Sequence, residues 1–187
     1  MSAARITVPP PHPATLSEEA LWKQVKFDRV RGSGPGGQRR NKVETGVELE
    51  HLPTGLRSIA TERRSPEENR TRALFRLRLR LAVEVRVEHA DETTGPNADS
   101  SSALVPSPLW QTRVREGRIV CNPTHHDFPA LLAEALDAVV RYGCDVKFAA
   151  GWLGCTTSQL VKFLADEPPA LARLNQERAD RHMPPLR

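Results

Sequence analysis

The pattern of apolar and polar positions predicts a short helix and a β-hairpin in the first half of the chain. Residues 16–27, "LSEEALWKQVKF", place apolar side chains at helical spacing behind Ser17, a predicted helix N-cap, and two glutamates occupy the first turn. Residues 43–62, "VETGVELEHLPTGLRSIATE", alternate apolar and polar positions on both sides of "PTG". This period of two, interrupted by a turn sequence, predicts the hairpin.

The next segment fits two periods. Residues 75–87, "FRLRLRLAVEVRV", alternate as a strand would, yet Leu74, Leu77, Leu81 and Val85 also form a helical stripe. Arg, Leu and Ala favour helices, so we predict a helix from 67 to about 83 and leave the valine-rich end open.

The second half of the chain predicts helices. "FPALLAEALDAVVRYG" has a continuous apolar stripe and ends at Gly143, a predicted C-cap. Residues 145–167 indicate two short helices separated by Gly154, the second capped by Thr156 or Thr157, with the spacing of a helix-turn-helix. A last helix is predicted from about 168 to 181.

These elements predict an α+β protein in two units. Residues 1–15 are proline-rich and lack a hydrophobic period, so we expect a disordered tail there. A small unit with a short sheet and packed helices should occupy 16–88, and a small all-α, helix-turn-helix-like unit should occupy 109–187. The polar stretch 89–108 is the predicted linker.

Charge changes the picture because it is clustered. The 27 Lys and Arg exceed the 23 Asp and Glu by only four, but residues 26–42 hold six basic side chains against one acid. Residues 57–80 hold eight arginines against three glutamates. This clustering predicts a polyanionic partner.

Other chemistry is expected to be absent. Three widely spaced cysteines without a Cys-x-x-Cys pair predict neither a disulfide framework nor structural zinc. "CNPTHHDF" groups Cys121, His125, His126 and Asp127 without a second ligand group, so we expect no metal and no cofactor. No secretory signal or membrane-spanning run stands in the sequence, and we expect a cytoplasmic protein.

The stretch "RGSGPGGQRRNK", residues 31–42, is the main candidate for function. Its Gly-x-Gly-x-x-Gly spacing fits a dinucleotide-binding loop, but a hairpin follows where that loop needs a helix, and Gln38 stands where a Walker motif needs lysine. Gly36 and Gly37 permit positive φ and close backbone approach, which leaves Gln38 as a donor at an exposed tip. Such a tip could dock into RNA and stabilise an oxyanion; a solvated structural loop is the alternative.

The stretches "RGSGPGGQRRNKVETGVELEHLPTGL" and "ERRSPEENRTRAL" resemble the catalytic domain of class I peptide chain release factors, especially the short members that rescue stalled ribosomes. The resemblance covers about residues 17–83. It implies that Gly36, Gly37 and Gln38 enter the peptidyl-transferase centre. There the Gln38 N–H would stabilise the tetrahedral transition state while its side chain admits water, and ribosomal RNA and the tRNA ribose would replace a protein general base.

The resemblance also implies which residues bind RNA. They are Arg31, Ser33, Arg39, Arg40, Asn41, Lys42, Arg63, Arg64 and Arg70. Three features depart from the family pattern: Gly32 replaces a small Ala or Ser, Arg39-Arg40 replace Asn or His followed by Val, and "SPEEN" replaces Ser-Gln-x-x-Asn. Arginines 76, 78 and 80 are expected on an exposed face, solvated or toward the ribosome.

Complete termination factors carry a codon-reading domain before this one, and only about 30 residues precede the loop here. We therefore expect a monomer that hydrolyses peptidyl-tRNA on the ribosome without reading a codon. The alternatives are a ribosome- or rRNA-binding factor without hydrolysis, or a DNA-binding protein that uses Ser158, Gln159 and Lys162 of the helix-turn-helix-like unit. That unit could instead serve helical packing or protein contacts.

Overall fold

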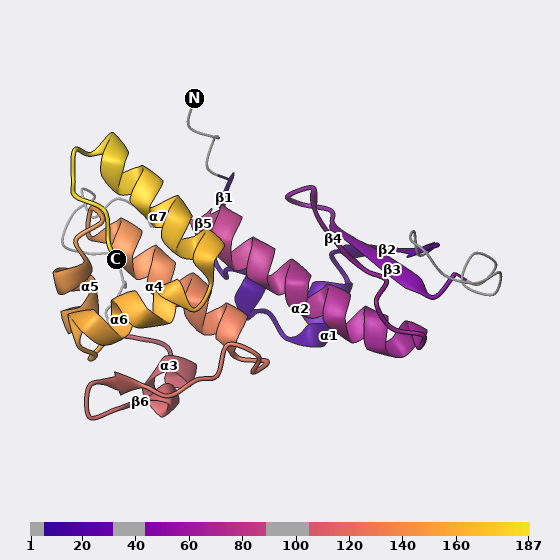
Figure 1. Cartoon of the computed structure of the whole chain (residues 1–187), viewed down its shortest axis with the longest axis horizontal. Coiled ribbons are helices and arrows are strands. Elements are labelled where there is room, and N and C mark those ends of the chain that lie inside the picture. The colour runs from indigo at the N-terminus through magenta and orange to yellow at the C-terminus, as the bar shows by residue number, and fades with distance from the viewer. Residues whose placement is uncertain (1–5, 32–43, 89–104) are drawn as a thin grey trace, which may run out of the picture.

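The computed structural model describes residues 6–31, 44–88 and 105–187. Strands lie mainly in the first half of the chain and helices in the second, and α2 runs between a small sheet and a group of helices (Figure 1). The elements are β1 (Ile6–Val8), η1 (Pro13–Thr15), α1 (Glu18–Trp22), β2 (Val25–Val30), β3 (Gly46–His51), β4 (Leu56–Ala60), α2 (Pro66–Glu84), β5 (Val85–Val87), α3 (Pro108–Arg113), β6 (Val114–Arg115), β7 (Arg118–Ile119), α4 (Phe128–Arg141), α5 (Val146–Trp152), α6 (Thr157–Ala165) and α7 (Pro168–Asp180).

The main sheet is antiparallel and has the order β2-β3-β4. Val47, Leu49 and Ala60 on one face are fully buried, and α2 packs against β3 and β4. The predicted hairpin is confirmed as β3 and β4, and the α+β class is confirmed with it. The predicted first helix is too long: α1 is capped by Ser17 as expected but ends at Trp22, because the following residues pair with β3 as strand β2.

Helix α2 settles the segment that fitted two periods. Ser65 caps its first turn, its leucine stripe is buried, and the valine-rich end leaves the helix as β5. Arg76 donates to the Ile59 carbonyl and Arg80 to the Arg57 carbonyl, on the free edge of β4. Four helical residues rise about 6 Å, close to the ~6.8 Å between alternate strand residues, so both guanidinium groups reach that edge.

The alternating arginines therefore have partners within the protein. Arg76 and Arg80 stay exposed, as expected, but each binds a strand carbonyl, and Arg78 donates to the Leu16 carbonyl. Guanidinium groups on the outer carbonyls of β4 also hinder a further strand from adding to this sheet edge.

The expectation of a disordered tail is wrong for residues 6–15. Strand β1 pairs in parallel with β5, and η1 packs against α2 and α4. His12 is buried: its Nδ1 accepts the Ala14 N–H at 3.0 Å and its Nε2–H donates to the Val85 carbonyl at 3.2 Å. A proline-rich segment cannot form a regular ladder of backbone hydrogen bonds, but it can still pack when a neighbouring strand and a buried histidine anchor it.

The second half packs against α2 through α4, and both halves contribute to one hydrophobic core. Helices α4, α5, α6 and α7 confirm the helical prediction, with Gly154 at φ +68° between α5 and α6. The all-α expectation missed the β6–β7 hairpin, whose turn places Glu116 and Gly117 at positive φ. The predicted linker lies mostly outside the described residues, and the domain boundary stays a prediction.

Among the described residues, no helix combines the length and the apolar character needed to cross a bilayer.

Candidate functional site

The glycine-rich stretch lies mostly outside the described residues. Of the residues predicted for it, Ser33, Gly36, Gly37, Gln38, Arg39, Arg40, Asn41 and Lys42 fall there. Arg31, Arg63, Arg64 and Arg70 are described, and so are the residues that flank the undescribed part of the stretch, up to Arg31 and from Glu44 onward. The site is therefore built here from the frame that holds it, which consists of the end of β2, the start of β3 and the first turns of α2.

The two ends of the stretch are held side by side in the sheet. Val30, the last residue of β2, pairs with Gly46, the first residue of β3. A Cβ on Gly46 would lie 2.7 Å from both the Val30 carbonyl oxygen and the Thr61 Cγ2. Only glycine fits this close approach without a shift of backbone. The frame therefore closes the stretch tightly at its base.

Asn69 links the frame to α2. It is fully buried, and its amide donates to the Thr45 carbonyl at 2.7 Å and the Arg63 carbonyl at 2.9 Å. Its Oδ1 accepts the Arg63 N–H at 3.0 Å. Ser65 begins α2 one turn earlier by accepting the Glu68 N–H, which sets the helical phase that points Asn69 inward. The "SPEEN" stretch is thus a structural brace for the end of the glycine-rich stretch.

The opposite end of the hairpin is fixed by His51. Its Nδ1 lies 2.8 Å from Thr54 Oγ1 and its Nε2 lies 3.0 Å from Gln24 Oε1, across the "HLPTG" turn. Burial lowers the pKa of His51, so the ring is held neutral in this network. Gly55 adopts φ +69° in the turn.

The described basic residues differ in their surroundings. Arg31 pairs with Glu44 at 3.1 Å across the two ends of the stretch, and Arg63 pairs with Glu68 at 3.4 Å. Both pairs are exposed and contribute little to stability. Arg70 lies over the Trp22 ring at 4.3 Å. Arg64 is exposed and has no ion-pair partner among the described residues.

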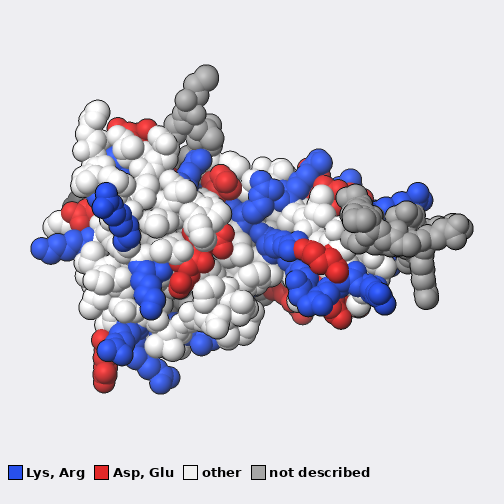
Figure 2. Space-filling view, in the orientation of Figure 1, with Lys and Arg blue, Asp and Glu red and all other residues white. Residues whose placement is uncertain are grey.

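Charge gathers around this frame. Figure 2 shows Lys and Arg side chains over the half of the molecule formed by the sheet and α2, with acidic side chains between them. Lys26 and Asp28 pair at 2.8 Å on β2, and Arg76 lowers the pKa of Glu62 by hydrogen bonding to it. The surface is therefore basic, although some of its charges are paired within the protein. A surface of this kind can contact phosphate groups and hold them in a fixed position.

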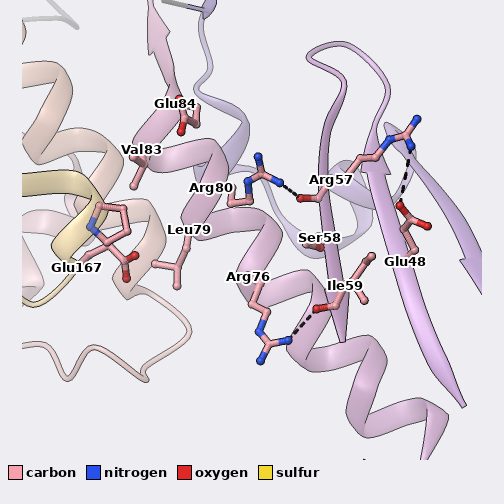
Figure 3. Close-up of a pocket in the computed structure, with 11 residues that line it drawn as sticks. Glu48, Arg57, Ser58, Ile59, Arg76, Leu79, Arg80, Val83, Glu84 and Glu167 are labelled. Atoms are coloured by element: carbon pink, nitrogen blue, oxygen red, sulfur yellow. Dashed lines mark hydrogen bonds and ion pairs between the residues drawn. The ribbon is translucent and has the colours of Figure 1, made fainter. Parts of the chain in front are cut away.

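A groove of about 640 Å³ lies between β4, α2 and the start of α7 (Figure 3). Arg76 and Arg80 point across it to β4 carbonyls, and Arg57 lies 4.0 Å from Glu48. Its only lining hydroxyl, Ser58, donates to the Ala73 carbonyl at 2.8 Å. These groups are committed to holding the sheet edge against α2, so the groove is a packing feature.

The histidine cluster belongs to an ion-pair network. Ligand atoms of His125, His126 and Asp127 lie within 4.8 Å of one another, and Cys121 is not among them. Asp127 binds Arg113, and its N–H donates to His125 Nδ1. The guanidinium already holds the carboxylate that a cation would need.

Comparison with known proteins matches residues 18–115 to the family model described as the RF-1 domain. "Peptide chain release factor 1" of Novosphingobium aromaticivorans is 33% identical over 162 residues, which cover 80% of this chain and 44% of the relative. The protein of the same name from Chlorobaculum tepidum is 33% identical over 149 residues, covering 75% of this chain and 40% of the relative. "Peptide chain release factor PrfB1, chloroplastic" of Arabidopsis thaliana is 44% identical over 93 residues, covering 47% and 20%. The chain spans less than half the length of these relatives.

The predicted stretch itself lies outside the described residues, so its role stays a prediction; the structure shows how the residues beside it are held. The motif residues Ser65 and Asn69 were recognised, but their role as cap and brace needed the structure. Gly46 was missed, although a lone glycine within a strand pattern is a signal for close backbone approach.

Proposed function

The chain belongs to the RF-1 domain family of class I peptide chain release factors, and from this we propose that it hydrolyses the ester bond of peptidyl-tRNA on the ribosome without reading a codon. Gly36, Gly37 and Gln38 form the reactive tip in this proposal. Its partners are large-subunit RNA and peptidyl-tRNA, and it acts as a cytoplasmic monomer without metal or cofactor.

The observation that carries the proposal is the frame. Val30 and Gly46 pair at the base of the stretch, and Gln38 is the midpoint of the sequence between them. Asn69 holds Thr45 beside that base from a buried position in α2. A tip that must meet a reacting ester needs such support, because misplacement by about 1 Å can cost ~10²-fold in rate.

The chemistry follows from what glutamine offers after two glycines. The Gln38 N–H would donate to the oxygen that becomes negatively charged when water attacks the ester carbonyl, and its side chain would orient that water. Neither group is a base, so RNA and the tRNA ribose would complete the proton transfer. The free protein is therefore expected to be almost inert. Arg31, Arg63, Arg64 and Arg70, with the basic residues of the stretch, would position the domain through phosphates.

Peptide release from purified ribosomes that hold peptidyl-tRNA tests the chemistry. Gly37→Ala disturbs the backbone that presents the Gln38 N–H and should lower the single-turnover release rate by ~10²–10³, the usual effect of losing a preorganised oxyanion donor. Gln38→Glu keeps that N–H but replaces the amide that orients the water, so release should fall as well. Gly151→Ala is the matched control, because nothing lies within 4 Å of its added Cβ. Equal release by wild type and Gly37→Ala would refute the proposal. Ribosome binding without release would support the binding-factor alternative.

A codon series tests the mode of action. The A site is left empty beyond the end of the mRNA, or filled by a sense codon or by a stop codon. The codon-independent mode rests on the resemblance of the sequence to short rescue factors. It predicts release that does not depend on a stop codon, and release at stop codons alone would contradict it.

A further inference from the structure

An exposed aromatic and basic surface runs along β2 toward the glycine-rich stretch. One face of this edge strand carries Val25, Phe27 and Arg29. These residues pair with His51, Leu49 and Val47 of β3, so they lie on the same face of the sheet that α2 packs against at β3 and β4. Helix α2 does not cover this face at the sheet edge, because Phe27 is 41% exposed and Arg29 is exposed.

The surface continues onto the neighbouring helices. The Trp22 ring at the end of α1 lies 6.4 Å from the Phe27 ring, centroid to centroid, and is tilted to it. The Arg70 guanidinium of α2 lies 4.3 Å over the Trp22 ring. Glu18 accepts the indole N–H at 3.1 Å, which fixes the ring orientation and uses its one polar group. The faces and edges of the rings are thus what this surface offers to a partner.

Its positive charge is not neutralised. Lys26 pairs with Asp28 and Arg31 pairs with Glu44, but Lys23, Arg29 and Arg70 have no carboxylate partner within 4 Å in the described part of the chain. Exposed rings beside cations that have no ion-pair partner suit a binding partner with both flat apolar faces and negative charge.

We propose that Trp22, Phe27, Arg29 and Arg70 form a contact for unpaired RNA, in which a base stacks on the Phe27 and Arg70–Trp22 surfaces and Arg29 holds a phosphate. Unstacked bases bind aromatic and guanidinium planes in this way, and the phosphate contact adds affinity without sequence preference. An apolar protein surface would satisfy the rings but not the three unpaired cations, whereas RNA brings a phosphate with every base. The contact rests on the proposed function, because Arg29 lies two residues before Arg31, where the chain enters the reactive stretch.

Fluorescence anisotropy with a labelled 12-nucleotide single-stranded RNA tests the contact without requiring hydrolysis. Phe27→Ala and Arg70→Lys should each weaken RNA binding at least about fivefold, because that is the affinity lost when one base no longer stacks. Lysine keeps the positive charge of Arg70 but lacks the planar guanidinium group on which a base can stack. Phe148→Ala and Arg115→Lys are the matched controls, because Phe148 is 68% exposed on α5 and Arg115 is exposed on β6. Arg29→Gln should lower the slope of log affinity against log salt by about 0.7, while Phe27→Ala should leave that slope unchanged.

An RNA of the same length with abasic residues separates stacking from charge. It should bind the wild type at least as weakly as intact RNA binds Phe27→Ala. Equal affinity for both RNAs, or variants no weaker than their controls while circular dichroism shows them folded, would overturn the proposal. Normal RNA affinity of Phe27→Ala combined with lost ribosome binding would overturn it in favour of a protein contact.

The two proposals can fail separately. Gly37→Ala should abolish release and leave affinity for the short RNA unchanged. A wild type that binds this RNA through Phe27 but never releases peptide would contradict the proposed hydrolysis alone.

Discussion

Replacing the Asn69 amide by a carboxyl is the sharpest test of the brace. Asn69→Asp keeps the side-chain volume and the bond that Oδ1 accepts from the Arg63 N–H. It converts the two donated bonds, 2.7 Å to the Thr45 carbonyl and 2.9 Å to the Arg63 carbonyl, into contacts between oxygens. One atom therefore changes the sign of two interactions at a fully buried position.

The magnitude follows from those contacts. Leaving a buried polar group without a partner costs about 1–3 kcal/mol, and two carbonyls lose their donor here. Because Thr45 is half-buried and water can reach part of the site, we expect the free energy of unfolding at pH 7 to fall by ~2–4 kcal/mol. The loss should shrink below pH 5, because a protonated carboxyl can donate one of the two bonds again.

Urea unfolding and peptide release measure the two consequences. Release by Asn69→Asp should be at least tenfold slower at a temperature where circular dichroism shows the variant folded. Asn175→Asp is the matched control: the Asn175 amide also bridges backbone groups, donating to the Leu186 carbonyl at 3.1 Å and accepting its N–H at 2.7 Å, but in the C-terminal half. It should lower stability and leave release unchanged. A free energy of unfolding within about 0.5 kcal/mol of wild type, or equal effects of both variants on release, would refute the brace.

Three further predictions test the frame and the core. Gly46→Ala should lower the free energy of unfolding in urea by ~1–3 kcal/mol, because the added Cβ meets the Val30 carbonyl. Gly151→Ala is the control and should be neutral or stabilise α5. Equal effects of the two variants would contradict the close approach at Gly46. Burial lowers the pKa of His12 from 6.5 to about 4, so only the unfolded chain takes up its proton as pH falls through that window. The stability that neutral His12 provides above pH 6.5 should fall by up to ~3 kcal/mol toward pH 4, and unfolding of His12→Gln between pH 7 and 4.5 should lack this part of the pH dependence. Leu81→Ala in α2 and Leu136→Ala in α4 should each shift one common unfolding transition by ~2–5 kcal/mol, and two separate transitions would disprove the shared core.

The elements that sequence predicted correctly are those with strong local signals. The hairpin has its alternation and "PTG", α2 has its leucine stripe, and the C-terminal helices have apolar stripes with glycine stops. Each of these signals is contained in about twenty consecutive residues, so the hydrophobic period and the capping residues can be read from the local sequence alone.

Two of the missed elements, β1 and β2, depend on partners far away in the chain, and the β6–β7 hairpin has only two residues in each strand. Strand β1 is three residues long and pairs with residues 85–87, so nothing near Ile6 indicates it. Strand β2 was taken for the end of a helix because its pairing with β3 spans the glycine-rich stretch. Strands of two or three residues have too few positions to show a period, and their stability comes from the neighbours they meet in the fold.

The candidate site divides in the same way. Gly36, Gly37 and Gln38 are predicted from their order in the sequence, without knowledge of any contact, and they stay a prediction because they lie outside the described residues. The roles of Gly46 and Asn69 depend on distances between segments 15 or more residues apart, such as that between Asn69 and Thr45. A polar residue at a buried helical position was the available signal for Asn69, and a motif alone does not say which carbonyl it holds.

Helix α2 connects the C-terminal half rigidly to the frame beside the glycine-rich stretch. Its first turns hold Thr45 through Asn69, its middle holds β4 through Arg76 and Arg80, and it packs against α4 (Figure 1). Nineteen helical residues span about 28 Å without a break. Helices α4 to α7 are therefore placed relative to the frame by a rigid element. Any partner that binds these helices is held at a fixed distance and direction from the frame, and under the proposed function α2 would couple recruitment to the aiming of the tip.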